Sequence, residues 1–145
     1  MDFSTALRVS ASGLSAQRMR MNTISSNIAN INTTRTPEGG PYRRKDVVFE
    51  SMADVRNFGE LVTVKPDEQI QRVQVTDVLS DRKAPMMKYE PDHPDANEDG
   101  YVAYPNINLM EEMANMIQAS RSYEANVAAV QSSKDMAMSA LEIGR

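Results

Sequence analysis

The chain has 145 residues, a formal net charge of −4 at pH 7, no cysteine and one histidine. The lack of cysteine excludes disulfides, thiol catalysis and thiolate metal sites, and one histidine leaves no histidine pair for zinc. The mild acidity argues against non-specific binding to nucleic acid, and no apolar run approaches the roughly eighteen residues of a membrane span, so no direct membrane insertion is expected. Leu, Ile, Val and Phe are scarce, and we therefore expect partner chains to supply part of the burial.

The first predicted element is a long helix over residues 3–31, which contain no proline. Apolar residues recur there at alternating spacings of three and four, as in a coiled coil. The asparagines of "NIANINTT" are expected to end the helix. Gly13 costs about 1 kcal/mol relative to alanine in a helix, so we expect another backbone to approach closely there. The residues of this stripe that we expect to form an assembly interface are Leu7, Leu14, Met21, Ile24, Ile28 and Ile31.

Residues 34–105 have a different character. The runs "KDVVFE", "ELVTV" and "QRVQVTDV" are short and rich in β-branched residues, which predicts a small, mostly antiparallel β region. The stretch "APMMKYEPDHP" is expected to be irregular because of its prolines. The basic run "RRK" at Arg43–Lys45 is interpreted as a solvated strand edge.

The stretch "DANEDGYVAYPN", from Asp95 to Asn106, begins like an EF-hand calcium loop. Its twelfth residue is Asn106 where a bidentate glutamate is needed, and Pro91 and Pro94 oppose an entering helix. We therefore expect an acidic surface turn, followed by a strand at "YVAY" that ends at Pro105. No catalytic, cofactor-binding or metal-binding residues are predicted, since no constellation of side chains supports them.

A second long helix is predicted from Leu109 to Ile143, with Asn108 as its N-cap and Gly144 as its stop signal. Its apolar stripe is wider than a two-helix seam, which indicates more than one neighbour. Because residues 3–37 lack acids, we expect this acidic helix to pair with the basic first one. The expected interface residues here are Met113, Met116, Ile117, Val127, Val130 and Leu141.

Together these elements predict an α+β fold that is mainly α. Two long terminal helices form an antiparallel coiled-coil-like hairpin, with a small β-rich insertion between them. The expected divisions are an N-terminal axial helix in 1–33, a β-rich and extended middle in 34–105 and a C-terminal axial helix in 106–145, the first and last forming one α domain.

The stretch "SASGLSAQRMRMNTISSNIANINT" resembles the signature helix of the flagellar rod and hook axial proteins. The residues that carry this motif are Ser12, Gly13, Leu14, Ala29, Asn30, Asn32 and Thr33. Two further stretches, "GGPYRRKDVVFE" and the chain from "YEPDHPDANEDG" to its end, narrow the resemblance to proximal rod proteins of the FlgC type. It covers about residues 4–49 and 71–145.

The resemblance implies a non-enzymatic structural subunit of the proximal rod in the bacterial flagellar basal body. Such a subunit would be exported without a cleaved signal peptide through the type III apparatus and would assemble in the periplasmic space. Its terminal helices would contact other copies, other rod proteins, and export-gate or adaptor proteins at the rod base, and the rod would transmit torque around the export channel. The alternative is a soluble cytoplasmic coiled-coil adaptor, whose apolar seam should be narrow.

Overall fold

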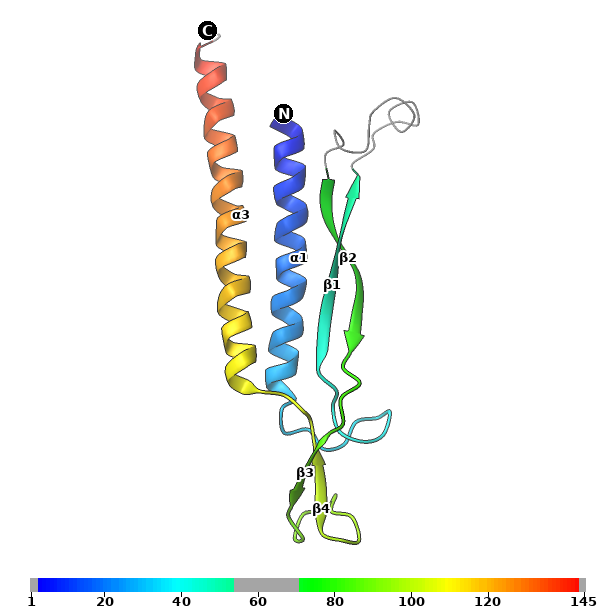
Figure 1. Cartoon of the computed structure of the whole chain (residues 1–145). Coiled ribbons are helices and arrows are strands. Elements are labelled where there is room, and N and C mark those ends of the chain that lie inside the picture. Colours follow the sequence, from blue (N-terminus) through cyan, green and yellow to red (C-terminus); the bar gives the residue numbers. More distant parts are fainter. Residues whose placement is uncertain (1–2, 54–70, 144–145) are drawn as a thin grey trace.

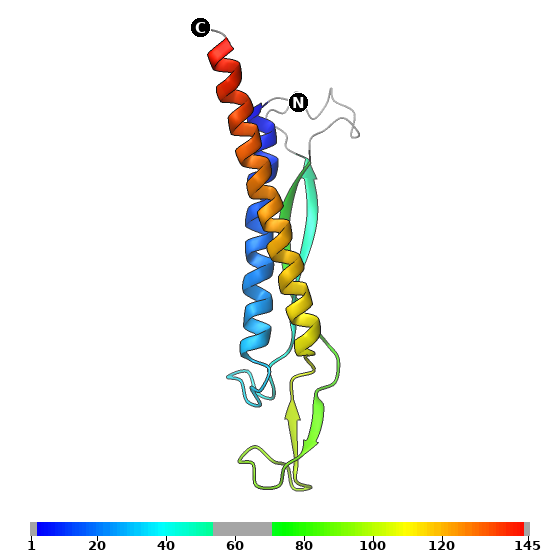
Figure 2. The same ribbon diagram turned by 90° about the vertical axis from the view of Figure 1, so that its left-hand side faces the viewer.

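The computed structural model describes residues 3–53 and 71–143. In chain order the elements are α1 (Phe3–Ala29), β1 (Lys45–Ala53), β2 (Gln71–Ser80), β3 (Met86–Tyr89), β4 (Tyr101–Tyr104) and α3 (Leu109–Ile143). α3 runs antiparallel to α1, and the β1–β2 hairpin lies along the opposite side of α1 (Figure 1). The β3–β4 ribbon projects beyond the helix ends (Figure 2). The predicted mainly helical fold with a β insertion is confirmed.

Local capping explains where the helices begin and end. At the end of α1, Asn30 donates to the carbonyl of Ser26 twice, from its backbone N–H (3.1 Å) and from its side-chain amide (2.9 Å). At the start of α3, Asn108 Oδ1 accepts from the backbone N–H of Met110 (3.0 Å), as an N-cap does. For both helices, the predicted first and last residues are confirmed to within two residues. Within the described residues, neither helix combines the length and apolar character needed to cross a membrane.

The strands agree with the sequence in three places and differ in one. β1, β2 and β4 lie where "KDVVFE", "QRVQVTDV" and "YVAY" predicted them, and "ELVTV" falls outside the described residues. The expectation that "APMMKYEPDHP" is irregular is wrong, because Met86–Tyr89 forms β3 and pairs with Tyr101–Tyr104. Its prolines flank this run and do not interrupt it, so they leave the ladder hydrogen bonds intact.

The interior of the described part is thin. Its buried apolar residues are Ala16, Ile24, Val102, Ile107 and Ala119, and its buried polar residues are Thr5, Thr23, Asn27, Glu112 and Ser133. The helix seam is therefore built mainly from small and polar side chains. Gly13 allows close packing at this seam, because a Cβ at this position would lie 3.0 Å from Oδ1 of Asn126. The close approach is as predicted, but the neighbour is a side chain of α3 and not a backbone.

α1 and α3 pack against each other as expected, but the acid buried between them takes its base from outside α1. Glu112 forms its ion pair with Arg44, which lies after α1 in the chain. Arg18 of α1 instead donates to the hydroxyl of Tyr123 across the seam (3.5 Å). Burial selects the nearest cation that can reach the carboxylate, and net charge along the helix does not reveal which one that is.

Candidate assembly surface

The first turns of α3 carry apolar side chains on their outer side. These residues, here called the basal apolar group, are Leu109, Met110, Met113 and Ile117. Their spacing places them on one side of the helix, adjacent to the side that holds buried Glu112 and Ala119. Met110 is 73% exposed. Among the described elements α3 packs only against α1, so nothing in that part of the chain covers this group.

A second apolar group lies at the other end of α3. Its members, the distal apolar group, are Met136, Met138 and Leu141. There α3 extends past the start of α1 (Figure 1), and Leu141 is 75% exposed. Between the two groups α3 exposes polar residues and alanines but no large apolar residue. The exposed residues there are Gln118, Arg121, Glu124, Ala125, Ala128, Ala129, Gln131, Ser132, Lys134 and Asp135. Each end of α3 therefore presents an uncovered apolar surface.

The predicted interface residues fall into three classes of burial. Only Ile24 is buried within the chain. The half-buried residues are Leu7, Leu14, Met21, Ile28, Ile31, Met116, Val127 and Val130. The exposed residues are Met113, Ile117 and Leu141. Apart from Ile24, the predicted interface residues thus keep part of their apolar surface exposed within the single chain.

Beside the basal apolar group, a buried polar cluster joins three segments that are distant in sequence. Asn27 of α1 is fully buried and uses all four of its hydrogen-bonding positions. Its Nδ2 donates to the carbonyl of Lys45 (2.8 Å) and to Oε2 of Glu112 (3.0 Å). Its Oδ1 accepts from the backbone N–H of Lys45 (2.9 Å) and from the hydroxyl of Tyr42 (3.1 Å). A single side chain therefore connects α1, the start of β1 and α3.

Arg44 completes this cluster. Its Nε donates to Oε1 of Glu112 (2.8 Å), and its Nη1 pairs with Asp46 (3.2 Å). Burial alone would lower the pKa of Arg44, but the hydrogen bonds and charges of Glu112 and Asp46 together outweigh it, so the pKa is raised. The sequence interpretation of "RRK" as a solvated edge therefore holds for Arg43 and Lys45, which are exposed, and is wrong for Arg44. Asn27, Arg44 and Glu112 are called the base cluster below.

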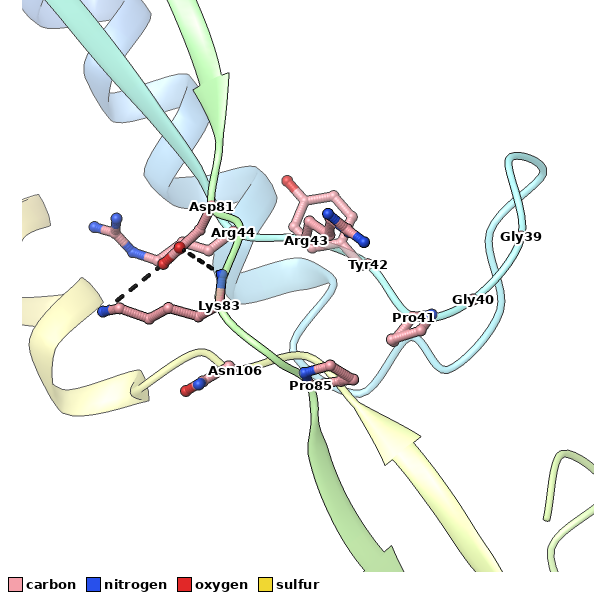
Figure 3. A pocket seen from close by; sticks show the side chains of 10 residues that line it. All are labelled: Gly39, Gly40, Pro41, Tyr42, Arg43, Arg44, Asp81, Lys83, Pro85 and Asn106. Atoms are coloured by element: carbon pink, nitrogen blue, oxygen red, sulfur yellow. Dashed lines mark hydrogen bonds and ion pairs between the residues drawn. The ribbon is translucent and has the colours of Figure 1, made fainter. Parts of the chain in front are cut away.

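A small open hollow lies beside the start of α3, between the Gly39–Gly40 loop and the segment after β2 (Figure 3). Two of its charged side chains pair with each other: the ammonium of Lys83 lies 3.8 Å from Asp81, whose Oδ1 also accepts from the Lys83 backbone N–H. Asn106 also lines it and donates to the carbonyl of Ala84 (3.2 Å). The hollow therefore offers neither an activated nucleophile nor a set of anionic ligands.

The loop that resembles an EF-hand is a turn closed by its own hydrogen bonds. Oδ1 of Asn97 accepts from the backbone N–H groups of Asp99 (3.1 Å) and Tyr101 (2.7 Å). Oδ2 of Asp95 accepts from Thr34 (2.8 Å), which ties the turn to the segment after α1. In the described part of the chain no group of three or more His, Cys, Asp or Glu side chains is arranged to hold a metal ion. The geometry is that of a structural turn.

Comparison with known proteins gives the family. Residues 7–35 match the family described as flagella basal body rod protein, and residues 98–143 match the C-terminal family of flagellar basal body rod FlgEFG proteins. The flagellar basal-body rod protein FlgC of Borreliella burgdorferi is 44% identical over 145 residues, which cover 96% of this chain and 95% of the relative. The chain belongs to the flagellar basal-body rod protein family.

Further relatives of the same name agree. The FlgC rod protein of Bacillus subtilis is 41% identical over 147 residues, covering 97% of each chain. That of Escherichia coli O157:H7 is 36% identical over 137 residues, covering 94% of each chain. The similarity to rod proteins therefore extends over nearly the whole chain and includes both terminal helices.

The residues at the two ends of the rod-family motif have clear structural roles. Ser12 Oγ donates to the carbonyl of Val9 (2.7 Å) and accepts from the backbone N–H of Val73 (3.2 Å), so it connects α1 to β2. Asn30 Oδ1 accepts from the hydroxyl of Thr33 (3.1 Å) just beyond the helix. Leu14 is half-buried, and Ala29 and Asn32 are exposed.

Proposed function

We propose that this chain is a structural subunit of the flagellar basal-body rod that assembles, with further copies and with other rod proteins, through the outer side of α3 and the half-buried stripe of α1. The observation that carries the proposal is the exposure of the basal and distal apolar groups on a chain with so thin an interior. Uncovered apolar surface of this kind marks interaction sites. Membership of the rod family supports the identity of the assembly.

The mechanism of such a subunit is mechanical. Long helices aligned along an axis resist twisting because many close-packed contacts must deform together. In this proposal the terminal helices of neighbouring subunits surround the export channel, and the resulting drive shaft transmits torque. Residues 1–33 and 106–145 act as one α unit in this role, and residues 34–105 supply the hairpin and the ribbon.

We extend the proposal to location and route. The subunit functions in the periplasmic part of the basal body and reaches it through the type III export apparatus without cleavage of a signal peptide. At the rod base it contacts export-gate or adaptor proteins. It requires no catalysis, cofactor or metal.

A cytoplasmic coiled-coil adaptor is not favoured. An adaptor that binds one partner helix needs one narrow seam, and α1 already occupies one side of α3. The basal apolar group lies outside that seam and requires further neighbours. Several neighbours for one helix are the condition of a subunit within a larger assembly.

The direct test is Ile117→Asp, which places a charge in the basal apolar group. Ile117 is 55% exposed, so the free energy of unfolding of the isolated chain should change by only about 0.5 kcal/mol. In an assembled interface the same carboxylate would be desolvated without a partner in every copy. We expect cells that export the variant but form no complete rod and do not swim.

The matched control is Gln131→Asp, which introduces the same residue in the polar middle of α3. This variant should swim, because its carboxylate stays beside other polar groups. Normal swimming of the Ile117→Asp cells, measured in soft agar and by imaging isolated basal bodies, would contradict the proposed interface.

A further inference from the structure

The side of α3 that faces α1 carries a line of residues spaced seven apart. The line consists of Glu112, Ala119, Asn126 and Ser133. Glu112 bonds to Asn27 of α1, Asn126 lies over Gly13, and the other two are buried. A helix returns to nearly the same side every seven residues, so sliding α3 by seven positions would replace each member of the line by the next.

Along this line, packing alone discriminates weakly between the native and the slid arrangement. After sliding, Ser133 would lie over Gly13, and serine is smaller than the asparagine that fits there now. Ala119 would come to lie opposite Asn27. No large apolar side chain belongs to this line. Sliding therefore does not remove a large side chain of the line from a cavity that only that side chain fits.

The base cluster discriminates strongly between the native and the slid arrangement. With Ala119 opposite Asn27, the amide of Asn27 loses its carboxylate acceptor (3.0 Å) and Arg44 loses its partner (2.8 Å). Buried polar and charged groups left without partners are among the most unfavourable features a fold can contain. Sliding in the opposite direction would bring Pro105 opposite Asn27, where a helix would have to include a proline.

We propose that the base cluster is a register lock, which fixes the axial position of α3 against α1. The small residues of the seam allow the helices to approach closely but carry little information about register. The base cluster, at the end of the α1–α3 helix pair where α1 ends and α3 begins, supplies that information, as a single polar residue does in a coiled coil. The lock also determines how far α3 extends past α1, and hence where the distal apolar group lies (Figure 1).

The test uses engineered disulfides in the full-length chain, because oxidation traps whichever register is populated. Gly13→Cys with Asn126→Cys reports the native register, since a Cβ at position 13 is already close to the Asn126 side chain. Gly13→Cys with Ser133→Cys, in a chain that also carries Asn126→Ala, reports the slid register. Gly13→Cys with Met136→Cys measures random collision, because Met136 is exposed.

Each pair is measured in two backgrounds, with the base cluster intact and with Asn27→Leu, Arg44→Met and Glu112→Met together. With the cluster intact, we expect only the native disulfide above the collision control. The apolar background should raise the ratio of slid to native disulfide by about tenfold or more while helix content, measured by circular dichroism, is unchanged. Native disulfide alone in the helical apolar background would overturn the register lock.

A second pair of variants decides the matter if the apolar background does not fold. Glu112→Gln keeps an oxygen that can accept from Asn27 or Arg44, and Glu112→Ala removes it. The alanine variant should give the slid disulfide, and the glutamine variant should remain mainly native. Equal ratios in the two variants would contradict the proposal. None of these readouts depends on assembly, so they are independent of the proposed rod function.

Discussion

At the base of the molecule buried polar groups satisfy one another, whereas at the far end of α3 apolar side chains remain exposed. Asn27 and Glu112 are at most 1% exposed, and both have their partners within the chain. Met136 and Leu141 are 64% and 75% exposed. The difference teaches that the chain satisfies the buried polar groups of its closed end by itself, whereas the apolar groups on the outer side of α3 have no cover within the described chain and are the surfaces proposed to meet neighbours.

The largest expected effect at the closed end comes from Asn27→Ala. This change removes the Asn27 partner of both backbone groups of Lys45 and of one oxygen of Glu112, while the hydroxyl of Tyr42 keeps its contact with Ser26 Oγ (3.3 Å). We expect a loss of about 3 kcal/mol in the free energy of unfolding, measured by urea denaturation of the full chain. Asn32→Ala, at an exposed position just after α1, is the control and should stay within about 0.5 kcal/mol. Equal losses would show that the closed end is not held by the base cluster.

A smaller effect is expected in the ribbon, from Gly100→Ala. Gly100 has a φ of +79°, and a Cβ there would lie 2.9 Å from a ring carbon of Tyr89. Steric overlap and the left-handed backbone together should cost about 2 kcal/mol. Gly39→Ala isolates the backbone contribution, since Gly39 has a φ of +91° with nothing within 4 Å. The control should lower the free energy of unfolding by about 1 kcal/mol. An equal loss in the Gly100 variant would show that the ribbon accommodates the added Cβ without a steric cost.

The smallest effect is electrostatic and also lies in the ribbon. Hydrogen bonds from Lys88 and Tyr104 lower the pKa of Glu90 below its ordinary value. A carboxyl whose pKa is lowered in the folded state stabilises that state above its unfolded pKa, and the contribution is lost as pH falls through the folded pKa. NMR titration should show this lowered pKa, and Lys88→Met should raise it. A Glu90 pKa unchanged by that substitution would show that Lys88 does not stabilise the Glu90 carboxylate.

The helices were predictable because each carries a long apolar period bounded by asparagine signals, and a local pattern of that length outweighs its exceptions. β3 was missed because Pro85 and Pro91 dominate its surroundings, and the decisive fact, pairing with Tyr101–Tyr104, is tertiary. "YVAY" was placed correctly, since its aromatic and β-branched residues favour a strand locally.

The base cluster was not predictable, because Asn27, Arg44 and Glu112 share no spacing or motif. Each was given a local role or none, and only folding brings them together. On the helix seam, Gly13 of α1 lies against Asn126 of α3, and Ala119 of α3 is buried. A search for large apolar residues overlooks such small ones.

Hydrogen exchange on the free chain and on isolated basal bodies tests most directly the claim that neighbours cover α3. In the dilute free chain, amides in the last turns of α3 should exchange much faster than those beside Asn27 and Glu112. Within the assembled rod the distal amides should become strongly protected, and the contrast between the two ends should largely disappear. Equal protection of the distal turns in the free chain and in the rod would contradict the claim.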